Sequence, residues 1–391
     1  MEQRRQRRGT LTAAHGATSS STLAVFVMAL LSFALATAAA VTPAPTPPPY
    51  HPPHPTPAGA KDIIMIPIDD MRPELGSYGC AHMDTPHMDA LATESLIFDN
   101  AYVAVAWCSP SRTALLTGRR PDATRTWSVV PTEFWRERGG NFTTLTQHFK
   151  ERGYLTLAVG KIFHPGAASG NSDSNYSWSW EGLPYDEGGI KCPTAKNLLR
   201  GLGGVATADA VRVETVTSSL KGGAAMSPSP TNQDDPLSPC ANRTFAAIAA
   251  RRRAGIDARP FFFSVGFHKP HIPWTVPQKY YDKYPLEGIS LAPHRLPPTK
   301  VPSIALNDIL SGYWSDTFSD FQALRANGSI TNSSPADGTM LNEYWSRRAR
   351  QAYWAALSYT DDNVGELIAS AKAAGLYANA IIVLWGDRTS F

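Results

Sequence analysis

Short apolar runs alternate along the chain with longer stretches of helical period. Four short runs rich in β-branched or aromatic residues lie at 63–68, 154–159, 261–265 and 380–385. Each has the length of a strand, and helical patterns separate them. This alternation predicts an α/β fold built on a large, mostly parallel central sheet flanked by helices.

The clearest predicted helix precedes the last strand. Its apolar positions from 353 to 371 recur along one face, and Gly375 is placed to end it. By contrast, the stretch at about 166–258 has little apolar period and is rich in Gly, Ser, Pro and Asp, so we expect an insertion of loops and short helices. The proline-dense segment 42–60 is expected to be a stiff linker. The folded domain is therefore predicted at 61–391.

Residues 1–41 have the pattern of a targeting segment. A basic start is followed by a Ser/Thr stretch and an apolar run at 23–41. The run suits a cleaved signal peptide, but its length also allows an uncleaved signal anchor, the one case in which we expect membrane contact. Both alternatives send the chain into the secretory pathway. Five Asn-X-Ser/Thr triplets agree with a glycoprotein: Asn141, Asn175, Asn242, Asn327 and Asn332.

The charge balance gives no indication of a nucleic-acid partner. The chain has 36 Lys and Arg against 33 Asp and Glu, and the excess comes from the arginines at the N-terminus. Four cysteines are present. Cys192 and Cys240 lie in an irregular stretch and could pair in an oxidising compartment, which would leave Cys80 and Cys108 unpaired.

Polar, reactive side chains follow each predicted strand. They are Asp69 and Asp70, then Lys161 and His164, then His268, Lys269 and His271, and finally Asp387. In a parallel sheet the carboxyl ends share one edge, where ligands bind. A single Asp after a strand is more often a cap or turn residue, but three carboxylates at one edge favour a site for Ca²⁺ or Mg²⁺. Lys161, His164 and His268 would supply positive charge and proton transfer for an anionic ester.

Cys108 follows an apolar lead-in and precedes a predicted helix. At a helix N-terminus, with Arg112 one turn later, it has the surroundings of an activated thiolate. The alternative is a buried cysteine that packs against Trp107.

One motif around Cys108 is long and specific. Cys108-Ser109-Pro110-Ser111-Arg112 followed by Leu116-Thr117-Gly118 resembles the sulfatase signature C-x-P-S-R-x-x-x-L-T-G. The runs IPIDDMRPELGSYG, GKIFHPG and GFHKPHIPW resemble the branch of that family that acts on iduronate 2-sulfate units of glycosaminoglycans. The resemblance extends from Lys61 to Asp387 and identifies the chain as a member of the sulfatase family.

This resemblance implies an alkaline-phosphatase-like fold and hydrolysis of sulfate esters of sulfated glycans. It also implies that a formylglycine-generating enzyme converts Cys108 to formylglycine, and that the protein resides in the lysosome or outside the cell. The implied calcium ligands are Asp69, Asp70, Asp387 and the modified Cys108. Arg112 and Lys161 would orient the formylglycine and offset sulfate charge, His164 would be a base, and His268 would contact the sulfate. No role is implied for Lys269 and His271 beyond shaping the pocket.

Two departures from the family pattern affect the expected activity. Arg388 follows Asp387 where the family has His or Asn, and the family's C-terminal subdomain has no counterpart here. We therefore expect a C-terminally truncated sulfatase domain. Two alternatives to a sulfatase activity remain: an inactive sulfatase-like protein that at most binds sulfated glycans, and a phosphodiesterase or phosphonate hydrolase of the same superfamily.

Overall fold

The computed structural model describes a large part of one compact unit, His51–Phe391. The described residues are 54–128, 134–179, 185–186, 189–190, 224–230, 234–235, 237–255, 257–294, 319–326 and 342–387. The predicted targeting segment 1–41, most of the linker 42–60, Cys192, Asn327, Asn332 and Arg388 lie outside them. Among the helices described, none has the length and apolar character needed to cross a bilayer.

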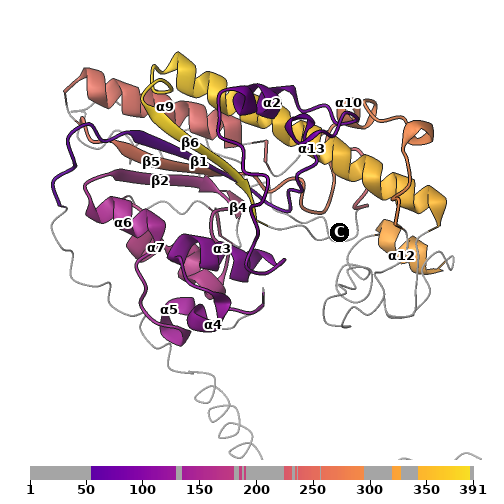
Figure 1. Ribbon diagram of the computed structural model, residues 1–391, viewed down its shortest axis with the longest axis horizontal. Helices are drawn as coiled ribbons and strands as arrows, with labels where there is room; N and C mark the ends of the chain where they lie inside the picture. Colours follow the sequence, from indigo (N-terminus) through magenta and orange to yellow (C-terminus); the bar gives the residue numbers. More distant parts are fainter. Residues whose placement is uncertain are drawn as a thin grey trace, which may run out of the picture. The chain divides into compact units, whose positions relative to one another are not determined.

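A four-stranded parallel sheet forms the centre of the fold, in the order β2-β5-β1-β6 (Figure 1). Its strands are β1 (Asp62–Ile68), β2 (Leu155–Gly160), β5 (Phe261–Gly266) and β6 (Ala380–Gly386). Each agrees within one residue with a predicted apolar run, so the predicted α/β sheet is confirmed. A separate antiparallel pair joins β3 (Tyr185–Asp186) to β4 (Gly189–Ile190).

Helices cover both faces of this sheet. On one face lie α2 (Pro86–Thr93), α9 (Leu237–Arg253) and α13 (Glu343–Ala373), and on the other lie α3 (Cys108–Thr117), α6 (Leu145–Glu151) and α7 (Gly170–Ser177) (Figure 1). Because strand side chains alternate between faces, Ile64 and Ile66 join the larger apolar cluster with α9 and α13. Met65 packs instead with Leu116 of α3.

Shorter elements connect these layers. They are η1 (Gly76–Tyr78), α4 (Pro121–Thr124), α5 (Trp135–Arg138), η2 (Ala167–Ser169), α10 (Gln278–Tyr281), η3 (Leu286–Gly288) and α12 (Ser319–Ala326). The predicted last helix is α13, which begins ten residues before its apolar face. Its first turns are partly exposed and so lack an apolar pattern, and the Asn342 side chain caps them by accepting from the Trp345 N–H at 3.0 Å.

The prediction of loops and short helices at 166–258 is wrong for α9, which is 17 residues long. Its buried side chains recur at helical spacing, but several are small or polar, and this hid the pattern. They are Leu237, Ser238, Cys240, Ala241, Thr244, Phe245, Ile248 and Ala249. Small side chains let the helix approach the sheet, and Phe245 packs edge-on against Phe263 of β5 at 5.1 Å.

The cysteines agree with the predicted pattern as far as they are described. Cys240 is disulfide-bonded, whereas Cys80 and Cys108 carry free thiols. Of the five glycosylation triplets, three have their asparagine at exposed, described positions: Asn141, Asn175 and Asn242.

Candidate active site

The parallel strands bring the predicted polar residues to one edge of the sheet. Two glycines make the edge compact where β2 and β5 end. A Cβ on Gly160, whose φ is +76°, would lie 2.1 Å from the Gly266 carbonyl oxygen, and one on Gly266 would lie 2.1 Å from the Lys161 oxygen. Only glycine permits this approach, which sets the position of Lys161.

Cys108 is the first residue of α3 and is 2% exposed. Its Sγ lies 3.4 Å from Asp69 Oδ1 and 3.5 Å from Lys161 Nζ. The neighbouring Trp107 side chain is 43% exposed. The structure therefore surrounds the thiol with charged groups and with the N-terminal end of a helix dipole, which favours a nucleophile more than a cysteine of the apolar core.

Arg112 is fully buried and connects the ends of three strands. Its Nε donates to Asp387 Oδ2 at 2.6 Å and its NH2 to Asp69 Oδ1 at 3.2 Å. Its NH1 donates to the carbonyl oxygens of Lys161 and Ile162 at 2.6 and 2.9 Å. Most of its donors are therefore used within the protein, so Arg112 positions the carboxylates around Cys108.

Asp69 lies at the centre of the site and is surrounded by cationic and imidazole groups. Lys161 Nζ contacts its Oδ2, while Arg112 contacts Oδ1. Burial raises the pKa of Asp69, but the positive charge of Lys161, with smaller contributions from His271, Arg112 and His268, holds this pKa well below the ordinary value. The carboxylate is therefore ionised, as a metal ligand or charge partner must be.

Asp70 and Asp387 adjoin Asp69. Asp70 has a φ of +63°, a strained conformation for a residue with a side chain, and its N–H donates to Asp387 Oδ1 at 2.8 Å. The Tyr353 hydroxyl of α13 donates to the Asp70 carbonyl at 2.9 Å, and the Ser111 hydroxyl donates to the Asp387 carbonyl at 2.5 Å. Helices on both faces of the sheet thus fix the two aspartates.

The donor set fits a hard divalent cation. Ligand atoms of Asp69, Cys108 and Asp387 lie within 4.8 Å of one another, and all three side chains are buried. Burial, together with the nearby charge of Asp69, raises the pKa of Asp387 to about 7. A cation among these groups would relieve that repulsion, and oxygen in place of the Cys108 sulfur would complete an oxygen set suited to Ca²⁺.

His164 is mostly buried beyond the end of β2. Burial, aided by the charge of Lys161, lowers its pKa to about 3, so the imidazole is neutral at ordinary pH. Its Nδ1 lies 3.0 Å from the Pro165 carbonyl oxygen and must donate to it. This tautomer leaves Nε2 as a proton acceptor, the arrangement that a base requires.

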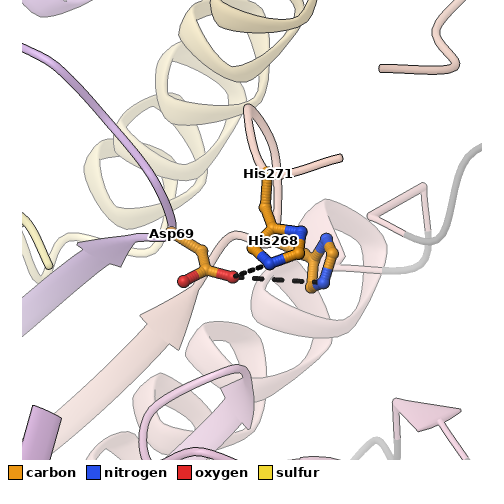
Figure 2. A group of neighbouring side chains, drawn as sticks. All are labelled: Asp69, His268 and His271. Atoms are coloured by element: carbon orange, nitrogen blue, oxygen red, sulfur yellow. Dashed lines mark ion pairs between the residues drawn. The ribbon is translucent and has the colours of Figure 1, made fainter. Parts of the chain in front are cut away.

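His268 and His271 both point at Asp69 (Figure 2). The Nε2 atom of each lies 4.0 Å from Asp69 Oδ2. Asp234 fixes the turn that carries them, because its carboxylate accepts from the N–H groups of His268 at 3.0 Å and Lys269 at 2.7 Å. Burial lowers the pKa of Lys269 to about 8, although Asp234 opposes that shift, and Lys269 Nζ donates to the His271 carbonyl at 3.3 Å.

Comparison with known proteins identifies the family. The sulfatase family model matches residues 61–390. The chain belongs to the sulfatase family. It is 37% identical over 331 residues to iduronate 2-sulfatase of Mus musculus and 37% identical over 332 residues to that of Homo sapiens, covering 84% of this chain and 54% of each relative. The chain thus spans about half the length of the curated relatives it matches.

Solved structures agree on the fold. Phosphonate monoester hydrolase from Silicibacter pomeroyi superposes with a TM-score of 0.56 at 19% identity, covering 84% of this chain and 63% of the other. The enzyme of the same name from Agrobacterium radiobacter gives a TM-score of 0.51 at 17% identity, with coverage of 84% and 63%. These likenesses support the predicted alkaline-phosphatase-like architecture.

In this member of the family the structure brings more residues together at the site than the sequence pattern predicts. His271 lies as near to Asp69 as His268 does, whereas the sequence motif implies for it only a role in the shape of the pocket. Its position three residues after His268 in the HKPH run was the available signal. Asp234 and Tyr353 come from segments far away in sequence and have no motif of their own, so only the fold reveals their contacts.

Proposed function

We propose that this chain is a sulfuric ester hydrolase that acts on sulfated sugars through a formylglycine derived from Cys108. The observation that carries the proposal is the setting of Cys108. It is buried at the N-terminus of α3, beside Lys161 and Asp69, within the sequence Cys108-x-Pro110-x-Arg112. This local motif is what a formylglycine-generating enzyme would recognise before the chain folds.

The residues around Cys108 have complementary roles in this proposal. In hydrated formylglycine, one hydroxyl would attack sulfur as the S–O bond to the sugar alcohol breaks and that alcohol takes up a proton; deprotonation of the second hydroxyl would then expel sulfate and restore the aldehyde. The Lys161 ammonium group lies 3.5 Å from Cys108 Sγ. Its positive charge would stabilise the anionic ester bound beside the modified residue. His164, neutral and with Nε2 as acceptor, takes the proton, while His268 contacts the sulfate near the departing alcohol.

Asp69, Asp70, Asp387 and the modified Cys108 would hold calcium. The ion would act as a Lewis acid that polarises bound oxygen, and the protein fixes its ligands through Arg112, Ser111 and Tyr353. The role of Arg112 in this proposal is therefore positional, since its Nε and NH1 groups donate to protein oxygens.

Iduronate 2-sulfate units of glycosaminoglycans are the proposed substrate. The support is the 37% identity to mouse and human iduronate 2-sulfatases over 84% of this chain. We place the protein in the secretory pathway, with the lysosome or the extracellular space as its destination, where a sulfated glycan would be available. The apolar run at 23–41 and the disulfide at Cys240 support this placement.

The test is expression in cells that contain the modifying enzyme, followed by mass spectrometry of the tryptic peptide carrying Cys108. The same preparation is assayed with 4-methylumbelliferyl sulfate, a 2-sulfated iduronate disaccharide and a phosphonate monoester. We expect formylglycine at Cys108 and hydrolysis of the sulfate esters, abolished in Cys108→Ala and retained in Cys80→Ser, which alters the other free cysteine.

Three results would contradict the proposal, each in a different way. An unmodified Cys108 removes the nucleophile. Formylglycine without hydrolysis of any ester indicates an inactive sulfatase-like protein. Preference for the phosphonate ester assigns the site to the other activity found in this superfamily.

A further inference from the structure

Asp69, His268 and His271 form a group of potential metal ligands beside the proposed calcium set. Their ligand atoms all lie within 4.8 Å of one another, and both imidazole Nε2 atoms are 4.0 Å from Asp69 Oδ2. Figure 2 shows both rings directed at that oxygen from the turn after β5. The His268 side chain is 13% exposed, that of His271 is 10% exposed, and Asp69 is fully buried.

The hydrogen bond made by His271 prepares it to bind a metal. Its Nδ1 lies 2.6 Å from the Ile272 carbonyl oxygen, an atom that can only accept, so Nδ1 carries the hydrogen. The Nε2 lone pair therefore faces Asp69. A metal-binding histidine is held in the same way, by an Nδ1–H bond to a carbonyl that fixes both the ring orientation and the tautomer.

His268 is held differently, through a hydrogen bond of its backbone. Asp234 anchors its backbone N–H, while its Nδ1 is buried and has no hydrogen-bond partner among the described residues. No hydrogen bond among the described residues therefore ties Nδ1 to one ring orientation. The two rings are 4.6 Å apart and inclined at 53°, so their nitrogens can approach a common point.

The spacing requires only a small contraction. Tetrahedral zinc with bonds of about 2.0–2.1 Å separates its ligand atoms by roughly 3.3 Å. To shorten each 4.0 Å distance between Nε2 and Asp69 Oδ2 to that value, the ligand atoms must move by less than about 1 Å. Two imidazoles and one carboxylate, with a fourth position left open, form a donor set that suits zinc, cobalt or another first-row transition ion.

The two oxygens of Asp69 separate this group from the calcium set. Oδ1 lies on the side of Cys108 and Arg112, whereas Oδ2 faces the two histidines and is also contacted by Lys161. Calcium prefers oxygen ligands, and imidazole nitrogen selects transition metals, so the two groups differ in the ions they favour. Lys161 also contacts Oδ2, so its positive charge opposes a cation at that oxygen and weakens metal binding.

We propose that Asp69, His268 and His271 form a second metal site that binds Zn²⁺ or a similar transition ion and shares only Asp69 with the proposed calcium ligands. An ion there would occupy the position where His268 is proposed to meet the sulfate. Zinc would therefore compete with the ester for this side of the pocket. The metal site does not depend on the proposed activity, since it needs neither formylglycine nor hydrolysis.

The test measures Co²⁺ binding to the full chain in a Cys108→Ala background, which removes the thiol as a competing ligand. We expect one equivalent of Co²⁺ with visible d–d bands of four- or five-coordinate cobalt. X-ray absorption should show two imidazole ligands per ion. His271→Gln and His268→Gln should each weaken binding at least tenfold, while His148→Gln, which alters an exposed histidine of α6, should leave it unchanged.

The X-ray absorption spectrum decides the result even if a histidine variant fails to fold. Fewer than two imidazoles, an oxygen-only shell, or no binding at millimolar Co²⁺ would overturn the proposal. Co²⁺ binding by the His268→Gln and His271→Gln variants as tight as that of the parent protein would also overturn it. Failure of the proposed sulfatase activity is a separate result, because it is measured on formylglycine formation and ester hydrolysis.

Discussion

Replacing Arg112 by methionine tests whether the buried charge network holds the site together. Methionine keeps an unbranched side chain of similar length but removes the guanidinium. The change leaves Asp387 and Asp69 without the cation that lies 2.6 and 3.2 Å from their oxygens. It also removes both NH1 hydrogen bonds to the carbonyls of Lys161 and Ile162.

The expected cost follows from these contacts. At an effective dielectric constant of about 20, each of the two charge contacts contributes roughly 5–6 kcal/mol of attraction before desolvation is counted. Burial of the charges offsets much of this, and loss of one partner from a buried pair typically destabilises a protein by about 3–5 kcal/mol. We expect Arg112→Met to lower the free energy of unfolding by about that amount.

The assay is equilibrium urea unfolding in EDTA, followed by tryptophan fluorescence, with Arg120→Met as the matched control. Arg120 pairs with Asp122 at 3.4 Å, but its side chain is 87% exposed, so its replacement should cost well under about 1 kcal/mol. A loss for Arg112→Met no larger than that of the control would refute the reasoning. If Arg112→Met does not fold, Arg112→Lys keeps the charge and should retain part of the stability.

The remaining predictions concern the backbone, a buried histidine and the proposed ion. Gly160→Ala should destabilise far more than Gly118→Ala: both have positive φ, but only at Gly160 does the new Cβ meet a backbone oxygen at 2.1 Å, and urea unfolding of the two variants measures the difference. His164 has a folded pKa of about 3 against about 6.5 when unfolded, so the unfolded state binds more protons below pH 6.5 and stability falls as the pH drops toward 3. The penalty reaches about 2 kcal/mol at pH 5, and His164→Gln should lose this part of the slope; an unchanged slope would contradict the neutral buried imidazole. Calcium at about 100 times its dissociation constant should stabilise the wild type by about 2.7 kcal/mol and leave Asp387→Asn unaffected, as differential scanning fluorimetry would show.

The strands and the polar residues that follow them could be predicted, because both are visible in short segments of the sequence. Each apolar run is followed within a few residues by its site residue, and a parallel sheet places those residues at one edge whatever the intervening segments do. Cys108 and Arg112 belong to one motif, so their shared helix was also predictable. The sequence pattern does not predict helix α9, because several of its buried positions hold small or polar residues such as Cys240 and Thr244, which do not give a clear apolar periodicity.

The contacts between distant segments had no local signal. Asp234 binds the turn of His268, and Tyr353 binds the Asp70 carbonyl, across separations that only the folded chain closes. The contacts of Arg112 likewise depend on the fold. Its sequence position suggested a group that offsets substrate charge, and the structure adds that burial among the ends of three strands directs its donors to Asp387, Asp69 and two carbonyls.

The same interactions therefore serve both the stability of the sheet edge and the geometry around Cys108. Ser111 and Arg112 follow Cys108 on the first turns of α3 and bind the backbone and side chain of Asp387, the last described residue after β6. In the folded chain these bonds fix Asp387 relative to α3, and thus relative to Cys108, which lies beside Asp69. A change at Ser111 or Arg112 would therefore move Cys108 relative to the carboxylates, even though neither side chain needs to touch a substrate.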